Sequence, residues 1–421
     1  MRNRILGIAG LTMRQAVRSR FVLCLFVLML SLLVGFALTI KGDGTAAGRL
    51  QMLLSYAIGA VGVVLGMAVL WLACGSVSTE IENRRLHLVL VKPVRNVELW
   101  IGKWLGIVTV AMLMLAVAGV FLAVAGQVAL HRTVPGSADG RAVRQQVLLA
   151  RHLAEAVRIP DVPGEARWHV DCPAVISASP AVATLQYRFV SPLRDLPAVH
   201  VHWEVVGPDG AQRFAVDRQA NMDGVNQLDV PVAHLRAGER VTLSFRVHPS
   251  ESESPQYVTF HPDHPVEMLI PTGGFRANLV RTLLLMFCRI ALLAALGVTV
   301  GTVFTFPVAV FVAVSMVVVT LFTQFVVFSS APERRSEHHH HGEEEEMPGW
   351  VEWTGDHLAI GIRFVVAPVL RYQVRGRLAA GVSVPWAEVH EAAGILIFVY
   401  GGALCALACG ALRRREIALP V

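Results

Sequence analysis

The sequence predicts an α-helical membrane protein that carries one large water-soluble, mostly β domain. Two observations predict the membrane part: 54% of the 421 residues are hydrophobic while 16% are charged, and long apolar runs recur along the chain. A third observation predicts the soluble part, because one stretch between two of these runs alternates apolar and polar residues as strands do. The chain is therefore expected to cross a bilayer several times and to hold a folded domain on one side of it.

Six apolar runs are long enough to cross about 30 Å of hydrocarbon. They lie near 21–40, 55–76 and 103–128 within residues 21–130, near 279–301 and 307–328 within residues 277–328, and near 392–412 within residues 392–421. The stretch 279–328 is too long for one helix, and Pro307 is expected to start a second one because proline suits the first helical turn. Residues 1–20 mix arginines with apolar residues, which predicts an amphipathic helix at the membrane surface.

Basic residues predict which side of the membrane each connection faces. They are concentrated before the first span, between the second and third spans, and after the last span in Arg413, Arg414 and Arg415, whereas the first outer loop carries only Lys41 and Arg49. Because cytoplasmic connections are enriched in lysine and arginine, both termini are predicted to be cytoplasmic. The same distribution accounts for the net charge of +6 without a nucleic-acid partner.

The soluble domain is predicted over residues 131–276, between the third and fourth spans and outside the cytoplasm. Gly140–Arg158 is expected to be helical, because Val143, Val147 and Leu153 recur near helical spacing. After Trp168 the period changes to two, which predicts about seven strands and a β-sandwich. These strands are expected near 184–190, 199–205, 212–217, 226–232, 241–247, 256–261 and 266–270.

Histidines raise the question of a metal site on the outer side. His200 and His202 would share one face of a strand, and His338, His339, His340 and His341 precede four glutamates in the outer segment 329–391, which is also expected to hold interfacial helices. Imidazole is a common ligand of divalent ions, so these histidines are candidates for weak binding. No third or fourth ligand is fixed by spacing, and no resident metal is predicted.

The connection 77–102 is the most distinctive part of the membrane portion. Its first half places Ile81, Leu86 and Leu90 among charged residues, which favours a short helix lying against a surface, and Pro93 is expected to end it. A basic loop that only fixes topology is the simpler alternative. That alternative does not require the spaced apolar positions or the proline.

These residues resemble the first cytoplasmic loop of ABC-2 type transporter permeases, where an acidic residue opens a short coupling helix, a proline follows, and G-K-W-L-G starts the third span. The stretches G-L-T-M-R-Q-A-V-R-S-R, F-T-F-P-V-A and R-R-R-E-I-A match habits of the same family. The resemblance covers the membrane portion. It implies six spans of ABC-2 type in a bacterial cytoplasmic (inner) membrane, a coupling helix that docks on two separate ABC ATPase subunits, a second permease copy or a related permease, and export of a substrate. The expected coupling residues are Glu80, Glu82, Asn83, Arg84, Leu86, Leu90 and Pro93.

The sequence itself predicts no catalysis and no cofactor in this chain. It contains no G-x-x-x-x-G-K-[ST] phosphate loop, so ATP and Mg are expected on the partner ATPase. Arg289, inside the fourth span, is a candidate for a polar substrate path. The alternative function is a membrane-anchored protein whose outer domain binds or scaffolds an envelope partner without transport.

Overall fold

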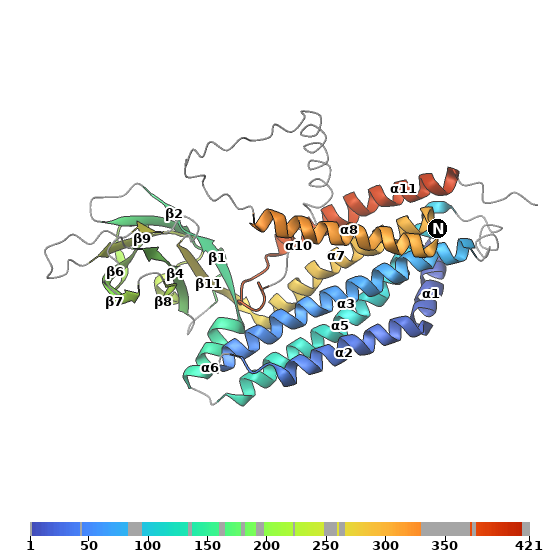
Figure 1. The fold of residues 1–421 in the computed structure, drawn as a ribbon. Helices are drawn as coiled ribbons and strands as arrows, with labels where there is room; N and C mark the ends of the chain where they lie inside the picture. The colour runs from blue at the N-terminus through green and yellow to red at the C-terminus, as the bar shows by residue number, and fades with distance from the viewer. Residues whose placement is uncertain are drawn as a thin grey trace, which may run out of the picture.

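The computed structural model shows a long bundle of helices with a β domain at one end (Figure 1). It describes residues 2–42, 44–82, 95–133, 137–159, 165–177, 182–190, 198–221, 224–247, 259–260, 266–329, 371–372 and 376–414. The N-terminus and helix α1 (Arg2–Arg18) lie at the end of the bundle opposite the β domain. This end is called the α1 end below.

The helices of the bundle occupy the six apolar runs that the sequence predicts. After α1 they are α2 (Arg20–Thr39), α3 (Ala46–Glu82), α5 (Asn96–Arg132), α7 (Phe275–Val303), α8 (Phe306–Ser329), and the continuous stretch of α10 (Trp386–Ala392), the π-helix η3 (Ala393–Tyr400) and α11 (Gly401–Arg414). Within the described residues, five of these stretches are long and apolar enough to cross a membrane, while α8 counts as a shorter apolar helix over Phe306–Val319. The multi-pass membrane class is confirmed, and the count of six spans stays a prediction.

The centre of the bundle is a close crossing of α3 and α7. A Cβ atom at Gly297 would lie 2.6 Å from the Cβ of Ala73, and one at Gly301 would lie 2.6 Å from the carbonyl oxygen of Cys74. Two glycines four residues apart on one helix face let the backbones approach closely. In a bilayer, where lipid is as apolar as leucine, this contact is a main source of helix association.

The outside of the bundle is apolar, as a surface covered by lipid requires. Large hydrophobic side chains project from α2, α5, α8, η3 and α11, among them Leu38, Val120, Phe311, Phe398 and Leu407, all of them more than half exposed. Such a surface is far too extensive for a protein in water. It supports the same multi-pass membrane class as the helix lengths.

The β domain consists of two main sheets and a short pair of strands. The four-stranded sheet has the order β1-β11-β4-β8, the five-stranded sheet the order β2-β3-β9-β6-β7, and β10 pairs with β5. All pairings between these strands are antiparallel. The strands are β1 (Leu149–Glu155), β2 (Val157–Arg158), β3 (Ala166–Asp171), β4 (Val182–Tyr187), β5 (Phe189–Val190), β6 (Ala198–Val206), β7 (Gln212–Asn221), β8 (Asn226–Pro231), β9 (Arg240–Val247), β10 (Thr259–Phe260) and β11 (Glu267–Gly274).

An aromatic core joins the two main sheets. Trp203 of β6 lies with its ring centroid 4.8 Å from that of Tyr187 on β4, and 4.9 Å from that of Phe245 on β9. Leu185 on β4 and Met268 on β11 belong to the same buried cluster. Because one core is shared by the inner faces of both sheets, the domain is sandwich-like, as predicted.

Strands lie within all seven predicted runs, of which 256–261 is described only over Thr259–Phe260, but the predicted helix over Gly140–Arg158 is wrong beyond its first half. Helix α6 (Ala138–Ala142) and the π-helix η1 (Val143–Val147) end before Leu149, and β1 and β2 follow. Val143 and Val147 are buried, whereas Leu153 is 39% and Val157 67% exposed. The apparent helical spacing therefore combined two buried helical residues with exposed residues of two strands.

A segment close to the last span completes the edge of the four-stranded sheet. The backbone N–H of Arg151 on β1 donates to the carbonyl of Gly381 (2.7 Å), and the N–H of Ser383 donates to the carbonyl of Arg151 (2.8 Å). Gly381 has a φ of +68°, and a Cβ there would lie 2.6 Å from the carbonyl oxygen of Gln146. Only glycine fits this left-handed, crowded position without strain.

The same segment is bound to the start of α7. The side-chain amide of Asn278 donates to the carbonyl of Val382 (2.9 Å) and its oxygen accepts from the N–H of Val384 (2.9 Å). Arg281 donates to the carbonyl of Val384 (2.8 Å). Residues 380–384, the linking segment below, thus connect the β domain to α7 and run directly into α10.

Candidate functional site

The predicted coupling region begins with a buried ion pair at the α1 end. Lys103 of α5 is 3% exposed, and its Nζ lies 2.6 Å from Oε1 of Glu80 at the end of α3. The same Nζ donates to the carbonyl of Ser76 (2.7 Å). A buried cation is tolerated when an opposite charge and hydrogen bonds surround it. The pair therefore fixes the end of α3 against the start of α5.

Glu82 makes a second connection, to α8. Its Oε1 accepts a hydrogen bond from the backbone N–H of Phe306, the first residue of α8 (2.8 Å). A carboxylate suits this place because the first N–H groups of a helix have no partner within the helix and carry a positive dipole end. Phe306 also packs edge-on against Trp71 of α3, with ring centroids 5.0 Å apart.

Helix α1 rests on the first turns of α5. A Cβ at Gly102 would lie 2.7 Å from the Cβ of Ile8, and one at Gly106 would lie 2.7 Å from the carbonyl oxygen of Ala9. The two glycines of the G-K-W-L-G stretch thus form the seat for α1. Together with the two glutamate contacts, this brings α1, α3, α5 and α8 together at one end of the bundle.

The described part of the predicted coupling surface is the pair of glutamates, both held by contacts within the chain. Asn83, Arg84, Leu86, Leu90 and Pro93 lie in 83–94, outside the described residues. The docking role of this surface stays a prediction. Glu80 and Glu82 gain a structural role that the sequence did not reveal.

Arg281 and Arg289 of α7 lie in different surroundings. Arg281 holds the linking segment through Val384, and its guanidinium carbon lies 5.9 Å from the ring centroid of Trp386. Arg289 is half-buried in the middle of α7. The substrate-path role of Arg289 stays a prediction.

The metal candidates on the β domain lie on the outer face of β6. Nδ1 of His202 is 2.7 Å from Oδ1 of Asp217 on β7, and His200 lies opposite Gln219. Among the residues that the structure describes, no group of three His, Cys, Asp or Glu side chains could hold a metal ion. His338–His341 lie outside the described residues.

A polar cavity that the sequence did not indicate lies where the β domain meets the bundle. Its volume is about 530 Å³. On each of β1, β11, β4 and β8, the two residues that line the cavity are two positions apart, so they lie on the same face of the strand. One wall is therefore the face of the four-stranded sheet opposite the aromatic core. The remaining walls come from α3, η1, the linking segment and Arg218 of β7. The lining residues are Gln51, Gln145, Gln146, Arg151, Leu153, Thr184, Gln186, Arg218, Gln227, Asp229, Glu267, Leu269, Ala380 and Val382.

Arg151 is the most buried charged residue of this cavity, at 6% exposure. Its Nη2 donates to the carbonyls of Gln146 (3.0 Å) and Ala380 (2.7 Å), whereas its Nε is buried and has no hydrogen-bond partner among the described residues. Burial lowers the pKa of this guanidinium, and the charge of Asp229 opposes that shift. Asp229 in turn accepts a hydrogen bond from Thr184 (3.1 Å).

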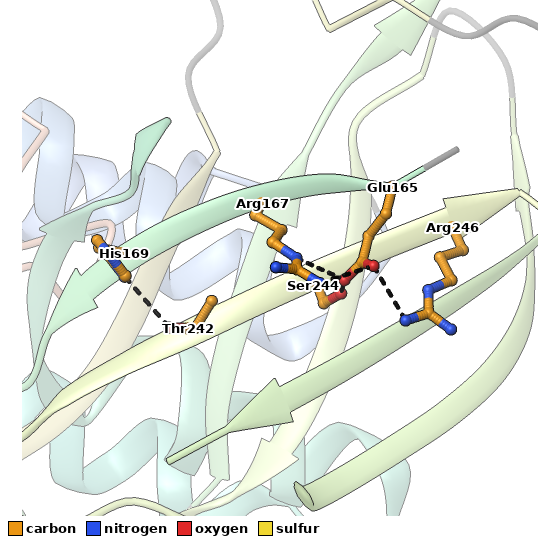
Figure 2. A network of polar contacts seen from close by, with 6 residues as sticks. All are labelled: Glu165, Arg167, His169, Thr242, Ser244 and Arg246. Atoms are coloured by element: carbon orange, nitrogen blue, oxygen red, sulfur yellow. Dashed lines mark hydrogen bonds and ion pairs between the residues drawn. The ribbon is translucent and has the colours of Figure 1, made fainter. Parts of the chain in front are cut away.

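A second polar network covers the outer face of the five-stranded sheet (Figure 2). Glu165 accepts two hydrogen bonds from Arg167 (2.8 and 3.0 Å), one from Arg246 (3.0 Å) and one from Ser244, while His169 contacts Thr242 (3.2 Å). The hydrogen bonds from Arg167 are the main cause that lowers the pKa of the Glu165 carboxyl, although burial opposes them. Both carboxylate oxygens of Glu165 thus accept hydrogen bonds from side chains of β3 and β9. This network therefore links β9 to the start of β3.

No protein-family model matches this chain, and no curated protein matches it significantly. A relation of its membrane portion to ABC-2 type permeases therefore stays a hypothesis, which rests on the short stretches of sequence named above.

Proposed function

We propose that the chain is the membrane subunit of an ATP-driven transporter of ABC-2 type, an exporter whose ATP hydrolysis takes place on two separate ATPase subunits. The observation that carries this proposal is the set of contacts around 83–94. The described residue before this segment is Glu82, which binds the first N–H of α8. The described residue after it is Arg95, next to the turns of α5 that contact α1. A partner that pushes on 83–94 would thus act on four helices at once.

Two contacts of the α3 end would transmit such a movement to the neighbouring helices. ATP-driven closure of the ATPase subunits would move the 83–94 segment, and Glu80–Lys103 and Glu82–Phe306 would pass that movement to α5 and α8. Differential contacts of this kind shift the populations of two helix arrangements. A second copy of the chain or a related permease would complete the transport path between two bundles.

Charge supports the orientation that this function needs. Arg14, Arg18 and Arg20 lie in or next to α1, and Arg413 and Arg414 end α11. The α1 end therefore carries the excess of arginine that is typical of the cytoplasmic side, which is where an ATPase would dock. The β domain then faces outward from the bacterial cytoplasmic membrane.

The test is co-purification of the full-length chain from native membranes in mild detergent, scored for a bound ATPase subunit and vanadate-sensitive ATP hydrolysis. The informative variant is Arg84→Glu, because changes at Glu80 or Glu82 would also disturb contacts within the bundle. The matched control is Arg276→Glu on the exposed surface of α7 at the other end.

We expect wild type and Arg276→Glu to retain the ATPase and Arg84→Glu to lose most of it while still eluting as a folded particle. Absence of an ATPase with wild type would overturn the proposal and leave the alternative of an outer binding or scaffold protein. Retention of the ATPase by Arg84→Glu would remove this arginine from the coupling surface.

A further inference from the structure

The cavity between the β domain and the bundle has the size of a ligand site. Its volume of about 530 Å³ lies within the range of about 300–1,000 Å³ that is usual for small-molecule pockets. Three parts of the chain far apart in sequence form it: the start of α3, residues 145–269 of the β domain, and the linking segment. It is thus built by the folded protein as a whole.

Arg151 is a cation buried in the wall of the cavity. Among the described residues its guanidinium donates to the carbonyls of Gln146 and Ala380 and forms no ion pair. A buried cation is costly unless an opposite charge lies beside it. The carboxylate of a bound ligand would supply that charge.

The charges of the lining define the kind of ligand further. Two cations, Arg151 and Arg218, stand with two acids, Asp229 and Glu267, so the lining has no net charge but offers both signs. A ligand with one carboxylate and one ammonium group matches such a lining, because each of its ends finds an opposite charge. A simple anion would match only the arginines.

The neutral part of the lining favours amide groups. Five of the lining residues are glutamines, and each primary amide both donates and accepts, as a peptide group does. None of the described lining residues is aromatic, so the wall offers no ring on which a sugar could stack. Leu153, Leu269 and Val382 add small apolar surfaces suited to short side chains.

We propose that this cavity binds a short zwitterionic peptide, whose carboxylate is held at Arg151 and whose backbone amides are bound by the glutamines. Val382 and Ala380 of its wall belong to the linking segment, which is hydrogen-bonded to α7 and leads into α10. Binding would therefore stabilise the present arrangement of β1, α7 and α10. The site concerns this chain alone and does not depend on an ATPase partner.

The test is calorimetric titration of the full-length chain in lipid nanodiscs, without any ATPase. The probes are trialanine with free termini, the same peptide with both termini capped, maltotriose, and inorganic phosphate. We expect trialanine to bind, the capped peptide to bind at least about tenfold more weakly because both charged ends are lost, and the sugar and phosphate to bind more weakly still.

Two variants probe the wall without removing the buried Arg151. Gln186→Leu and Arg218→Gln should each weaken trialanine binding about tenfold, by the loss of one polar contact. The matched controls are Gln219→Leu and Arg236→Gln, which change exposed residues outside the cavity and should leave binding unchanged. No heat from trialanine up to about 10 mM, tighter binding of maltotriose or phosphate, or equal binding by all four variants would each overturn the proposal.

Discussion

The helix bundle and the β domain are held together in opposite ways. At the centre of the bundle the contacts are made by the smallest residues, with Gly297 and Gly301 against Ala73 and Cys74. At the centre of the β domain they are made by the largest, including Trp203 and Tyr187, which are less than 2% exposed. Both regions are apolar inside, so composition alone does not explain the contrast.

The difference follows from the solvent around each region. In water, burying a large aromatic side chain is favourable in proportion to its area, so the sandwich gains most from tryptophan and tyrosine. In a bilayer that gain is absent, and helices associate through close backbone contact. The two regions should therefore respond differently to truncation and to added volume.

Truncation of the sandwich core should have the largest effect. We expect Trp203→Ala to lower the free energy of unfolding of the β domain by about 3–5 kcal/mol, because a large buried side chain leaves a cavity. Hydrogen–deuterium exchange should rise in β6 and β9 while α3 and α7 keep their protection. Trp386→Ala, a truncation at a 50% exposed site, is the matched control. Equal loss of protection in α3 would show that the two regions unfold as one unit.

Adding volume at the crossing of α3 and α7 should have the second largest effect on stability. In Gly301→Ala the new Cβ would meet the backbone carbonyl of Cys74, so α3 and α7 must move apart, at about 3 kcal/mol. We expect faster exchange in α3 and α7 with β6 unchanged. The same substitution at Gly402, which faces open space, should have no such effect. If both variants behave alike, close packing at Gly301 does not hold the bundle.

Removal of the charge of Glu165 should cost about 2 kcal/mol in the β domain, because its side chain is 7% exposed and hydrogen-bonded to two arginines. The measurement is denaturant unfolding of Glu165→Gln beside wild type. Since the folded-state pKa of Glu165 is lowered, its contribution is present above the ordinary glutamate value of about 4.3 and is lost as the pH falls below it. The gap between the two proteins should therefore narrow in acid, and a gap independent of pH would contradict the ionic role.

The exposed pair of Asp171 and Arg240 should matter least. The two side chains are 2.6 Å apart, but both are more than 60% exposed, so water and salt screen their attraction. We expect Asp171→Asn to unfold at nearly the same denaturant concentration as wild type. A loss as large as that in Glu165→Gln would mean that burial does not decide the strength of these pairs.

Much of the fold was predictable because its signals are local. Apolar runs gave the helices, and the alternation over 199–205 and 241–247 gave strands β6 and β9. Strand β1 was not predicted, because its partners, β11 and the linking segment, are distant in sequence. Its residues also do not alternate between apolar and polar, since Arg151 and Leu153 share one face of the strand. Local periodicity carries no information about such partners.

The sites were predictable to a smaller extent. The sequence singles out Glu80 and Glu82 as predicted coupling residues, but their contacts with Lys103 and Phe306 depend on how three helices cross. The polar cavity left a faint signal in the pairs Thr184–Gln186 and Gln227–Asp229, each with polar residues two apart on a strand. Nothing in the sequence shows that these strands lie in one sheet facing Gln51 of α3.

The position of the linking segment in the chain also determines when the β domain can be completed during synthesis. Arg151 and its partner Ala380 are 229 residues apart. At a synthesis rate of about 5–20 residues per second, the outer edge of β1 emerges roughly 10–45 s before the segment that covers it. Until the linking segment arrives, this edge of β1 presents open backbone groups, which invite pairing with other chains. The edge of the four-stranded sheet can therefore be closed only after the segment that precedes the last helix has been made.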